Sequence, residues 1–181
     1  MSWSRIARRI RVPLGFLFAA LFLLLARPSW LSLAMGGVVA TGGVWLRAAA
    51  SGHVRKNAEL TTTGPYAYTR NPLYLGSVLI ACGFAVASRS WIVFLICLAL
   101  FLAIYLPVIR SEEQFLRSQF VGFSEYCERV PRLIPRLRPA PGASPGSFSR
   151  ALYLQHREYN AALGTAAMLG ALVAKLLWLQ R

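Results

Sequence analysis

Residues 61–77, TTTGPYAYTRNPLYLGS, combine turn residues with aromatic and basic side chains that suit a binding site. Asparagine favours the position before a helix and proline suits the first turn, so Asn71 and Pro72 predict a helix start. A helix that begins there presents free N–H groups and the positive end of its dipole. Gly64 and Pro65 mark a turn just upstream. The stretch therefore fits either a plain turn and helix start or one wall of a site.

A second group with chemical potential is the carboxylate pair Glu112 and Glu113. The chain has 6 acidic residues in all, and two adjacent ones beside an apolar segment are expected to have partners. Segments 72–88 and 91–112 predict an outgoing and a returning helix, about 24 and 32 Å long at about 1.5 Å per residue. This hairpin brings the glutamates back near the level of Pro72. The two glutamates fit either a site shared with the start of the outgoing helix or a solvated position in which they pair with neighbouring arginines.

The segment after the glutamates adds aromatic and basic side chains. Phe120, Phe123 and Tyr126 recur at helical spacing and predict an amphipathic helix that closes the site from the cytoplasm. The arginines that follow fit a simpler role, which is to anchor the chain at the membrane surface. They are Arg129, Arg132, Arg136 and Arg138.

The composition indicates which elements position these groups. The chain has 181 residues, of which 56% are hydrophobic and 14% are charged, and its mean hydropathy is +0.51. A soluble domain of this length could not bury so much apolar surface, so we expect an all-α, polytopic membrane helical bundle. The net charge of +14 does not indicate nucleic acid, because the basic residues lie between apolar runs rather than along one face.

Five apolar segments predict about five transmembrane helices. They are residues 12–27, 30–49, 72–88, 91–109 and 160–179. The N-terminal run resembles a secretory signal, but Arg27 and Pro28 follow it in place of a small-residue cleavage site, so we expect a retained helix. The chain divides into a membrane core of four spans at 1–138, a Pro/Gly/Ser linker at 139–149, and an interfacial segment with the fifth helix at 150–181.

The distribution of arginine and lysine predicts the orientation of the bundle. Segments 1–11, 47–71 and 110–158 carry most of the basic residues, whereas each short hairpin on the other side carries one. Basic residues are enriched in cytoplasmic loops, so the N-terminus and both long loops are expected in the cytoplasm. We therefore expect an integral protein of the inner or plasma membrane, with its chemistry at the cytoplasmic face.

The cysteines and histidines do not predict a metal centre. The cysteines are widely spaced, form no CxxC pair, and are expected to be ordinary core thiols. They are Cys82, Cys97 and Cys127. His53 fits an interfacial position better than a catalytic one, and His156 precedes the last span. The neighbours that the fifth helix could bring to the site are Glu158, Tyr159 and Asn160.

The order of these blocks makes the chain resemble a known family. ELTTTGPYAYTRNPLYLG, a helical hairpin, the glutamate pair and EYCERVPRLIP resemble the isoprenylcysteine carboxyl methyltransferases over residues 58–135, and more distantly the phospholipid N-methyltransferases. In the first family the opening block typically reads G-x-Y-x-x-x-R-H-P-x-Y-x-G. The resemblance implies an integral-membrane methyltransferase that uses S-adenosylmethionine without a Rossmann fold.

The resemblance also implies roles for individual residues. Glu112 would hold the methionine end of the cofactor through its ammonium group, and Glu113 is the adjacent alternative. The other residues expected to bind the cofactor are Leu60, Thr61, Tyr66, Asn71, Pro72, Leu73 and Tyr74.

Two positions depart from the family pattern. Asn71 stands where the family has histidine, and asparagine cannot carry the proton that an imidazole role would need. The family's arginine for the substrate carboxylate falls on Val108. Arg110 is then the nearest candidate for a catalytic role, and Arg70 is the next.

The expected acceptor is a lipophilic, membrane-borne molecule, with a carboxylate on a prenylated or isoprenoid-like compound as the leading choice. A carboxylate nucleophile arrives ionised, whereas an amine must first lose a proton to a base within reach. N-methylation of an aminophospholipid is therefore the second enzyme hypothesis. A membrane reductase that uses NADPH and a non-catalytic assembly protein are the remaining alternatives.

Overall fold

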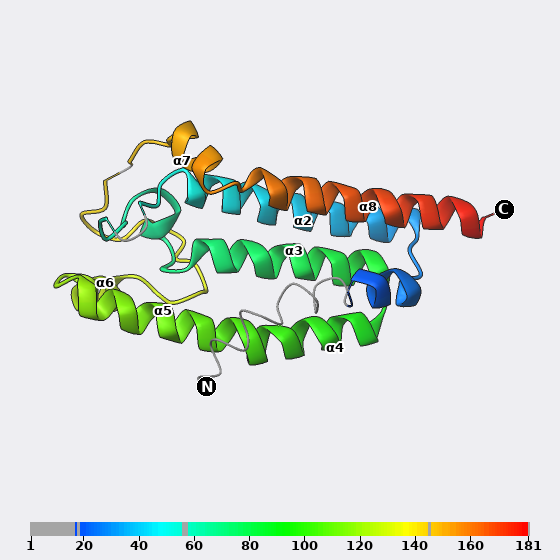
Figure 1. The fold of residues 1–181 in the computed structure, drawn as a ribbon, viewed down its shortest axis with the longest axis horizontal. Helices are drawn as coiled ribbons and strands as arrows, with labels where there is room; N and C mark the ends of the chain where they lie inside the picture. Colours follow the sequence, from blue (N-terminus) through cyan, green and yellow to red (C-terminus); the bar gives the residue numbers. More distant parts are fainter. Residues whose placement is uncertain (1–16, 18, 56–57, 145, 181) are drawn as a thin grey trace.

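The computed structural model describes residues 17, 19–55, 58–144 and 146–180, and every regular element among them is helical (Figure 1). The all-α class is therefore confirmed. A helical stretch at residues 19–25 comes first. The elements that follow are α2 (Trp30–Ser51), η1 (Gly64–Ala67), α3 (Pro72–Ser88), α4 (Trp91–Leu100), η2 (Phe101–Tyr105), α5 (Leu106–Gln119), α6 (Phe123–Arg129), α7 (Arg150–Gln155) and α8 (Tyr159–Leu179).

Three helices of the described chain are long and apolar enough to cross a membrane. They are Trp30–Ser51, the continuous helix Trp91–Gln119 and Tyr159–Leu179. The apolar helix α3 has 17 residues, so it is about 25 Å long and needs local thinning of a bilayer core of about 30 Å. The expected helical membrane bundle is thus confirmed. Residues 12–16 and 18 of the first expected span, and the N-terminal segment 1–11, lie outside the described residues.

Glycines allow α2 and α3 to pack with their backbones in contact. A Cβ atom at Gly36 would lie 2.3 Å from the carbonyl oxygen of Gly83, and one at Gly43 would lie 2.6 Å from that of Gly76. Larger side chains would force the two helices apart, which is why small residues are enriched at close helix contacts in membranes. This contact fixes the position of α3 and of the residues at its start.

Other glycines of the long apolar helices face outward. Gly37, Gly42, Gly164 and Gly170 all have open space where a Cβ atom would be built. Neighbouring residues on a helix point about 100° apart, so only one glycine of each pair in α2 can face α3. Gly37 and Gly42 therefore take no part in the contact with α3.

The continuous helix Trp91–Gln119 carries the two glutamates (Figure 1). Its middle is the π-helical turn η2, and Pro107, just after it, lacks the N–H that an uninterrupted α-helix would use. The ring of Tyr105 meets that of Tyr74 edge to face, with centroids 6.0 Å apart. The turn is thereby connected to the start of α3.

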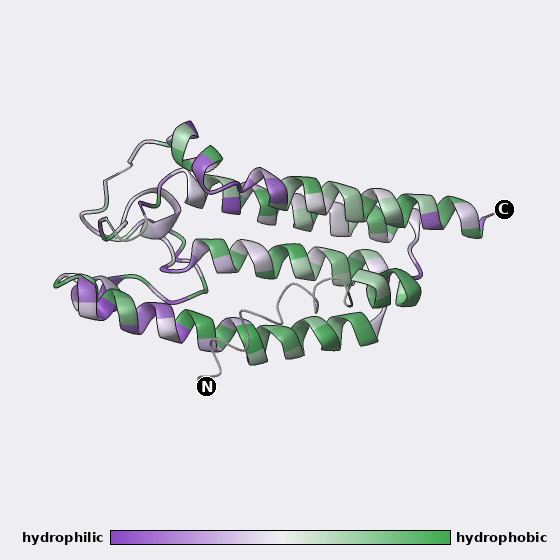
Figure 2. Cartoon of the chain, viewed as in Figure 1, coloured by the Kyte–Doolittle hydropathy of each residue, from purple (hydrophilic) through white to green (hydrophobic). Residues whose placement is uncertain are grey.

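Two clusters of buried apolar residues hold opposite ends of the bundle. One cluster contains Phe22, Ala26, Leu33, Ala87, Val93, Leu172 and Leu176. The other contains Phe123, Tyr126, Val130 and Ala140. Figure 2 shows hydrophilic residues gathered at the end of the bundle that holds α6 and α7, while the long helices are mostly hydrophobic. The second cluster therefore supports the polar end, where the chemistry is expected.

The segment expected as a linker, 139–149, makes backbone hydrogen bonds at both ends. Ala140 N–H donates to the carbonyl of Ala67 at 2.9 Å, and Ser149 N–H donates to that of Gly52 at 2.8 Å. Phe148 lies beside the ring of His53, with centroids 6.3 Å apart. These contacts hold the segment against η1 and the end of α2.

Candidate functional site

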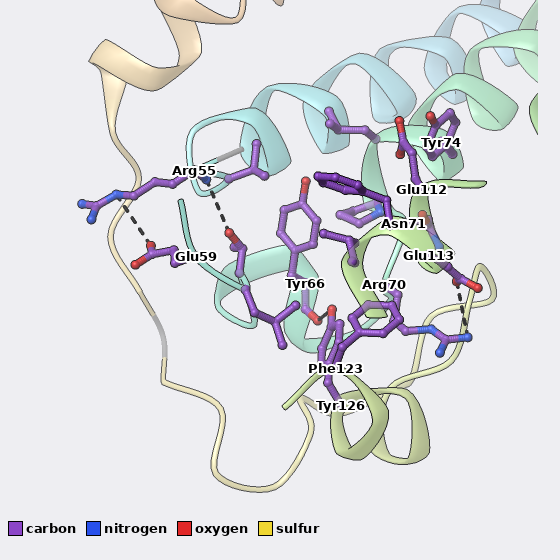
Figure 3. Close-up of a pocket in the computed structure, with 17 residues that line it drawn as sticks. Arg55, Glu59, Tyr66, Arg70, Asn71, Tyr74, Glu112, Glu113, Phe123 and Tyr126 are labelled. Carbon is purple, nitrogen blue, oxygen red and sulfur yellow. Dashed lines mark hydrogen bonds and ion pairs between the residues drawn. The ribbon is translucent and has the colours of Figure 1, made fainter. Parts of the chain in front are cut away.

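A cavity of about 350 Å³ opens at the polar end of the bundle, beside η1, the start of α3, α5 and α6 (Figure 3). This volume lies in the range of small-molecule pockets, about 300–1,000 Å³. The residues singled out in the sequence that line it are Leu60, Thr61, Tyr66, Arg70, Asn71, Pro72, Leu73, Tyr74, Glu112 and Glu113. The fold therefore brings two distant sequence blocks together in one site.

Arg110, the first candidate for binding a substrate carboxylate, is not among the residues that line the cavity. It is exposed on α5, and it precedes Glu112 by two residues, so it points about 200° away from it around the helix. Arg70 does line the cavity. Arg70 is consequently the arginine of the two that can meet a molecule in the cavity.

Several lining residues were not singled out for the site from the sequence. They are Val54, Arg55, Glu59, Phe115 and Leu116. Phe115 and Leu116 follow Glu112 by three and four residues, so helical spacing could have identified them. Val54, Arg55 and Glu59 lie in irregular backbone after α2, and no spacing rule applies to them.

The turn before α3 positions Tyr66. Gly64 has a φ of +55°, and a Cβ atom there would lie 2.5 Å from the ring of His53, so glycine is required on both counts. Pro65 then suits the first position of η1 because its fixed φ matches a helical turn. This arrangement buries Tyr66, and Figure 3 shows its ring inside the cavity.

Asn71 lies at the expected cap position of α3, but its side chain makes no capping hydrogen bond. Its ψ of 56° is outside the extended range that capping residues usually adopt. The side-chain amide instead donates to Glu113 Oε1 at 3.2 Å and to the carbonyl of Arg132 at 3.0 Å. Asn71 therefore precedes the helix as expected, but its side chain binds a buried carboxylate in place of the free N–H groups of α3.

Glu113 is buried at the centre of a charged cluster. Arg132 approaches it most closely, with Nη2 2.7 Å and Nε 2.9 Å from Oε2. Arg70 Nη2 lies 3.5 Å from Oε1. The hydrogen bond to Glu113 raises the pKa of Arg132, so Arg132 stays charged and the carboxylate has a well-placed partner. The alternative of a solvated glutamate pair does not hold for this residue.

Arg132 belongs to a segment, residues 131–136, that we call the strap. Arg70 N–H donates to the carbonyl of Pro131 at 2.9 Å, and Arg136 N–H donates to that of Tyr68 at 3.0 Å. The hydroxyl of Thr69 adds a bond to the carbonyl of Arg132 at 3.2 Å. The strap is thereby fixed along residues 68–71, and Arg132 points at Glu113 rather than serving as a surface anchor.

Glu112 has a different environment from its neighbour. It is exposed on α5 and lines the cavity, and Figure 3 shows it beside Tyr74. Within the described part of the chain, no hydrogen bond or ion pair joins the side chain of Glu112 to another residue. Its carboxylate is therefore available to a cationic group in the cavity.

Two buried tyrosines form the floor of the cavity. Tyr126, from α6, donates its hydroxyl to the carbonyl of Tyr66 at 2.8 Å. Burial is the main cause that raises the pKa of both phenols, so both stay neutral at physiological pH. Phe123 is also buried and lines the cavity. The helix expected to close the site is thus α6, and it presents these rings to the cavity.

The two histidines make contacts with backbone carbonyls. His53 Nδ1 lies 2.8 Å from the carbonyl of Ala49, and His156 Nδ1 lies 3.1 Å from that of Ser51. Neither lines the cavity. Among the residues that the structure describes, no group of three or more histidine, cysteine or acidic side chains could hold a metal ion.

Comparison with known families gives a match over less than half of the chain. Residues 43–121 match the sequence profile of the phospholipid methyltransferase family. This is the group that the sequence resembles more distantly, and the isoprenylcysteine-specific assignment stays a prediction. The matched segment contains η1, α3, α4, η2 and α5, with both glutamates, and it supports a membrane methyltransferase.

Two curated proteins are similar to this chain. The cobalt-zinc-cadmium resistance protein CzcN of Cupriavidus metallidurans is 39% identical over 119 residues, which cover 65% of this chain and 54% of that protein. The nickel-cobalt-cadmium resistance protein NccN of Alcaligenes xylosoxydans xylosoxydans is 36% identical over 116 residues, which cover 60% of this chain and 54% of that protein. The chain thus spans about half the length of these relatives. No solved structure gives a significant match.

Proposed function

We propose that this protein is an integral-membrane methyltransferase that moves a methyl group from S-adenosylmethionine to a lipophilic acceptor in the bilayer. The observation that carries the proposal is the cavity beside Glu112, within the segment that matches the phospholipid methyltransferases. We place the site at the cytoplasmic face, because the basic segments 47–71 and 110–158 surround it. A cofactor from the cytosol and an acceptor from the membrane can meet there.

The donor set of the cavity fits the cofactor. Glu112 offers an unpaired carboxylate to the ammonium of the methionine end, and the start of α3 offers a positive dipole end to its carboxylate. The rings of Tyr66 and Phe123 offer flat apolar surfaces to the adenine. When bound, S-adenosylmethionine supplies an electrophilic methyl group, which a nucleophile takes by in-line displacement with release of S-adenosylhomocysteine.

Catalysis by this chain would depend on positioning and on exclusion of water. Methyl transfer needs the nucleophile in line with the breaking bond, so a fixed wall reduces the entropy of activation. The contacts of Glu113 with Arg132 and Asn71 fix the strap and the start of α3 against α5. Phe123 and Tyr126 of α6 line the cavity, and their rings would limit access of water from that side.

For a carboxylate acceptor, Arg70 is the residue of this chain that supports binding. It lines the cavity, and its Nε is buried without a hydrogen-bond partner among the described residues. A second anionic group could therefore bind the guanidinium edge that Glu113 does not use. Arg110 stays outside this proposal because it is exposed and does not line the cavity.

An amine acceptor is the second candidate, and a specific observation favours it. The cavity is lined by three carboxylates, those of Glu59, Glu112 and Glu113, while both arginines that line it already face a carboxylate. An acidic cavity favours a cationic headgroup, and a carboxylate could accept the proton that an amine must lose before methylation. The name of the matching family agrees with this alternative.

The decisive experiment is calorimetric binding of S-adenosylmethionine to the purified protein in detergent, with NADPH as a parallel ligand. Binding that Glu112→Gln weakens supports the proposal. Absence of binding together with no effect of Glu112→Gln would refute it, and preferential binding of NADPH would indicate a reductase. Lipid profiling of cells that make the protein then separates the acceptors. Methylated ethanolamine headgroups indicate the amine, whereas base-labile methyl esters indicate the carboxylate.

The names of the two relatives refer to metal resistance, and a role of this kind for our chain is a separate proposal. In the described part of the chain, no cluster of metal-binding side chains supports direct binding of a metal ion. A contribution to metal resistance would then act through methylation of a membrane component. Growth of cells with and without the protein on cobalt, zinc or cadmium salts tests this, and a Glu112→Gln variant tests its dependence on the cavity.

A further inference from the structure

An ion pair outside the cavity connects α8 to the cavity wall. Arg47, near the end of α2, forms a two-pronged contact with Glu158, which immediately precedes α8. Nε lies 3.0 Å from Oε2, and Nη2 lies 2.9 Å from Oε1. Both side chains are largely buried, with 22% and 11% of their surfaces exposed. A charged residue in a membrane helix is rare and usually faces a functional part of the bundle.

The third nitrogen of the Arg47 guanidinium contacts α3. Nη1 donates to the carbonyl of Leu73 at 3.2 Å and also to the hydroxyl of Ser77. Leu73 lies in the first turn of α3 and lines the cavity. Gly76 makes room for this contact, because a Cβ atom there would lie 2.6 Å from Arg47 Cγ. One guanidinium therefore joins Glu158 to the first turn of the cavity wall.

The Arg47 guanidinium needs a carboxylate partner at this place. A positive charge near the first turn of a helix faces the positive end of the helix dipole, and Arg47 is also largely withdrawn from water. Glu158 neutralises this charge and fixes the guanidinium plane at two points, which a single contact could not do. By comparison, the pair Arg55–Glu59 is 3.7 Å apart with both side chains mostly exposed, and such pairs contribute little.

We propose that Glu158 is a positioning residue for the cavity: through Arg47 it holds the Leu73 carbonyl and the first turn of α3 in the geometry that binds the cofactor. The cofactor part of this inference rests on the proposed function. Glu158 lies outside residues 43–121, so the inference gives α8 a role that the family match does not.

A control must separate positioning of the cavity from general attachment of α8. Lys175 provides it, because its ammonium contacts the carbonyls of Leu23 and Leu24, the latter at 3.1 Å, near the other end of α8. Lys175→Met removes a charged contact of the same helix far from the cavity. If Glu158 served only to attach α8, Glu158→Gln and Lys175→Met would have the same consequences.

The first readout is hydrogen exchange of the complete protein in detergent without any ligand. Glu158→Gln is expected to accelerate exchange over residues 72–78 by about tenfold, because the first turn of α3 loses its fixed partner. Lys175→Met should leave exchange over 72–78 unchanged and accelerate it near residues 19–26 and 170–179. Unchanged exchange over 72–78 in Glu158→Gln, or equal acceleration in both variants, would overturn the inference whether or not the protein binds S-adenosylmethionine.

The second readout is the dissociation constant for S-adenosylmethionine. Glu158→Gln should weaken binding about tenfold, Glu158→Asp should restore part of it, and Lys175→Met should stay within about twofold of the natural protein. Failure of the natural protein to bind would refute the proposed function, and the exchange result would still decide the role of Glu158. Equal weakening by Glu158→Gln and Lys175→Met would contradict a specific effect on the cavity.

Discussion

Replacement of Glu113 by glutamine should destabilise the polar end of the bundle more than any other single change in the cavity. The carboxylate is buried and faces Arg132 at 2.7 Å, Arg70 at 3.5 Å and the Asn71 amide at 3.2 Å. A glutamine of the same shape keeps one acceptor oxygen, but it loses the negative charge and presents its amide N–H₂ to one of the two guanidinium groups. Two positive charges would then lie close together, and one of them is largely buried.

The expected loss is about 2–3 kcal/mol of unfolding free energy. Removal of one partner from a fully buried ion pair costs about 3–5 kcal/mol, and the effect here is smaller because Arg132 is 44% exposed and can turn toward water. In a protein of this length, each kcal/mol lowers the midpoint of thermal unfolding by about 2–4 °C. Glu113→Gln should therefore lower the midpoint by roughly 5–10 °C.

Glu112→Gln is the matched change, since it removes the same charge one residue earlier. Glu112 has no partner among the described residues, so its midpoint should change by less than about 1 °C, because surface charges of this kind contribute little. Binding of S-adenosylmethionine should instead weaken by about 10–100-fold, the effect of losing a charge-assisted hydrogen bond. Thermal unfolding in detergent, followed by tryptophan fluorescence, and calorimetric binding measure the two effects. Equal midpoints for the two variants would refute the assignment of a structural role to Glu113 and a binding role to Glu112.

Three further changes test individual contacts by the same unfolding assay. Asn71→Ala should lower the unfolding free energy by about 1–3 kcal/mol, because Glu113 and the strap lose a donor. Asn71→His should lower it less, because one ring N–H can replace the amide. Equal losses in the two variants would argue against this contact. Tyr126→Phe should lose about 1 kcal/mol, because the Tyr66 carbonyl loses its buried donor, and no change would mean that water replaces it. Gly36→Ala should lower the unfolding free energy by about 1–3 kcal/mol, because the added methyl group overlaps α3, whereas Gly37→Ala should leave it nearly unchanged. Similar unfolding free energies for the two variants would contradict the close packing of α2 on α3.

The sequence predicted the elements and residues whose spacing is local. Apolar runs predicted the long helices, and the Asn-Pro and Gly-Pro pairs predicted the start of α3 and the turn before it. Helix lengths were sufficient to place the glutamates opposite Pro72, since a hairpin of two helices returns to its starting level. The lining of the cavity by Tyr66, Tyr74 and Glu112 follows from the same geometry.

The partners of the buried charges could not be predicted in this way. Asn71 was expected to cap α3 by its type alone, but Glu113 and the Arg132 carbonyl, 42 and 61 residues further along the chain, compete for its amide. The strap has no helical or strand period, so its path along residues 68–71 depends on backbone hydrogen bonds that no sequence pattern encodes. For the same reason the sequence did not distinguish the two glutamates, which differ in burial rather than in type.

The polar end of this bundle is formed by residues inside the segment that matches the family and by residues beyond it. The matched segment, 43–121, supplies the cavity wall and both glutamates, whereas Arg132 and Glu158 come from segments beyond it. Each of these two residues neutralises a buried charge of the matched segment, Glu113 in one case and Arg47 in the other. Without these two residues, Arg47 would lose its carboxylate partner and Glu113 would keep only the more distant Arg70, which is unfavourable at low exposure. It follows that residues 43–121 do not form the site by themselves, and that the strap and α8 must be kept in any protein fragment chosen to test it.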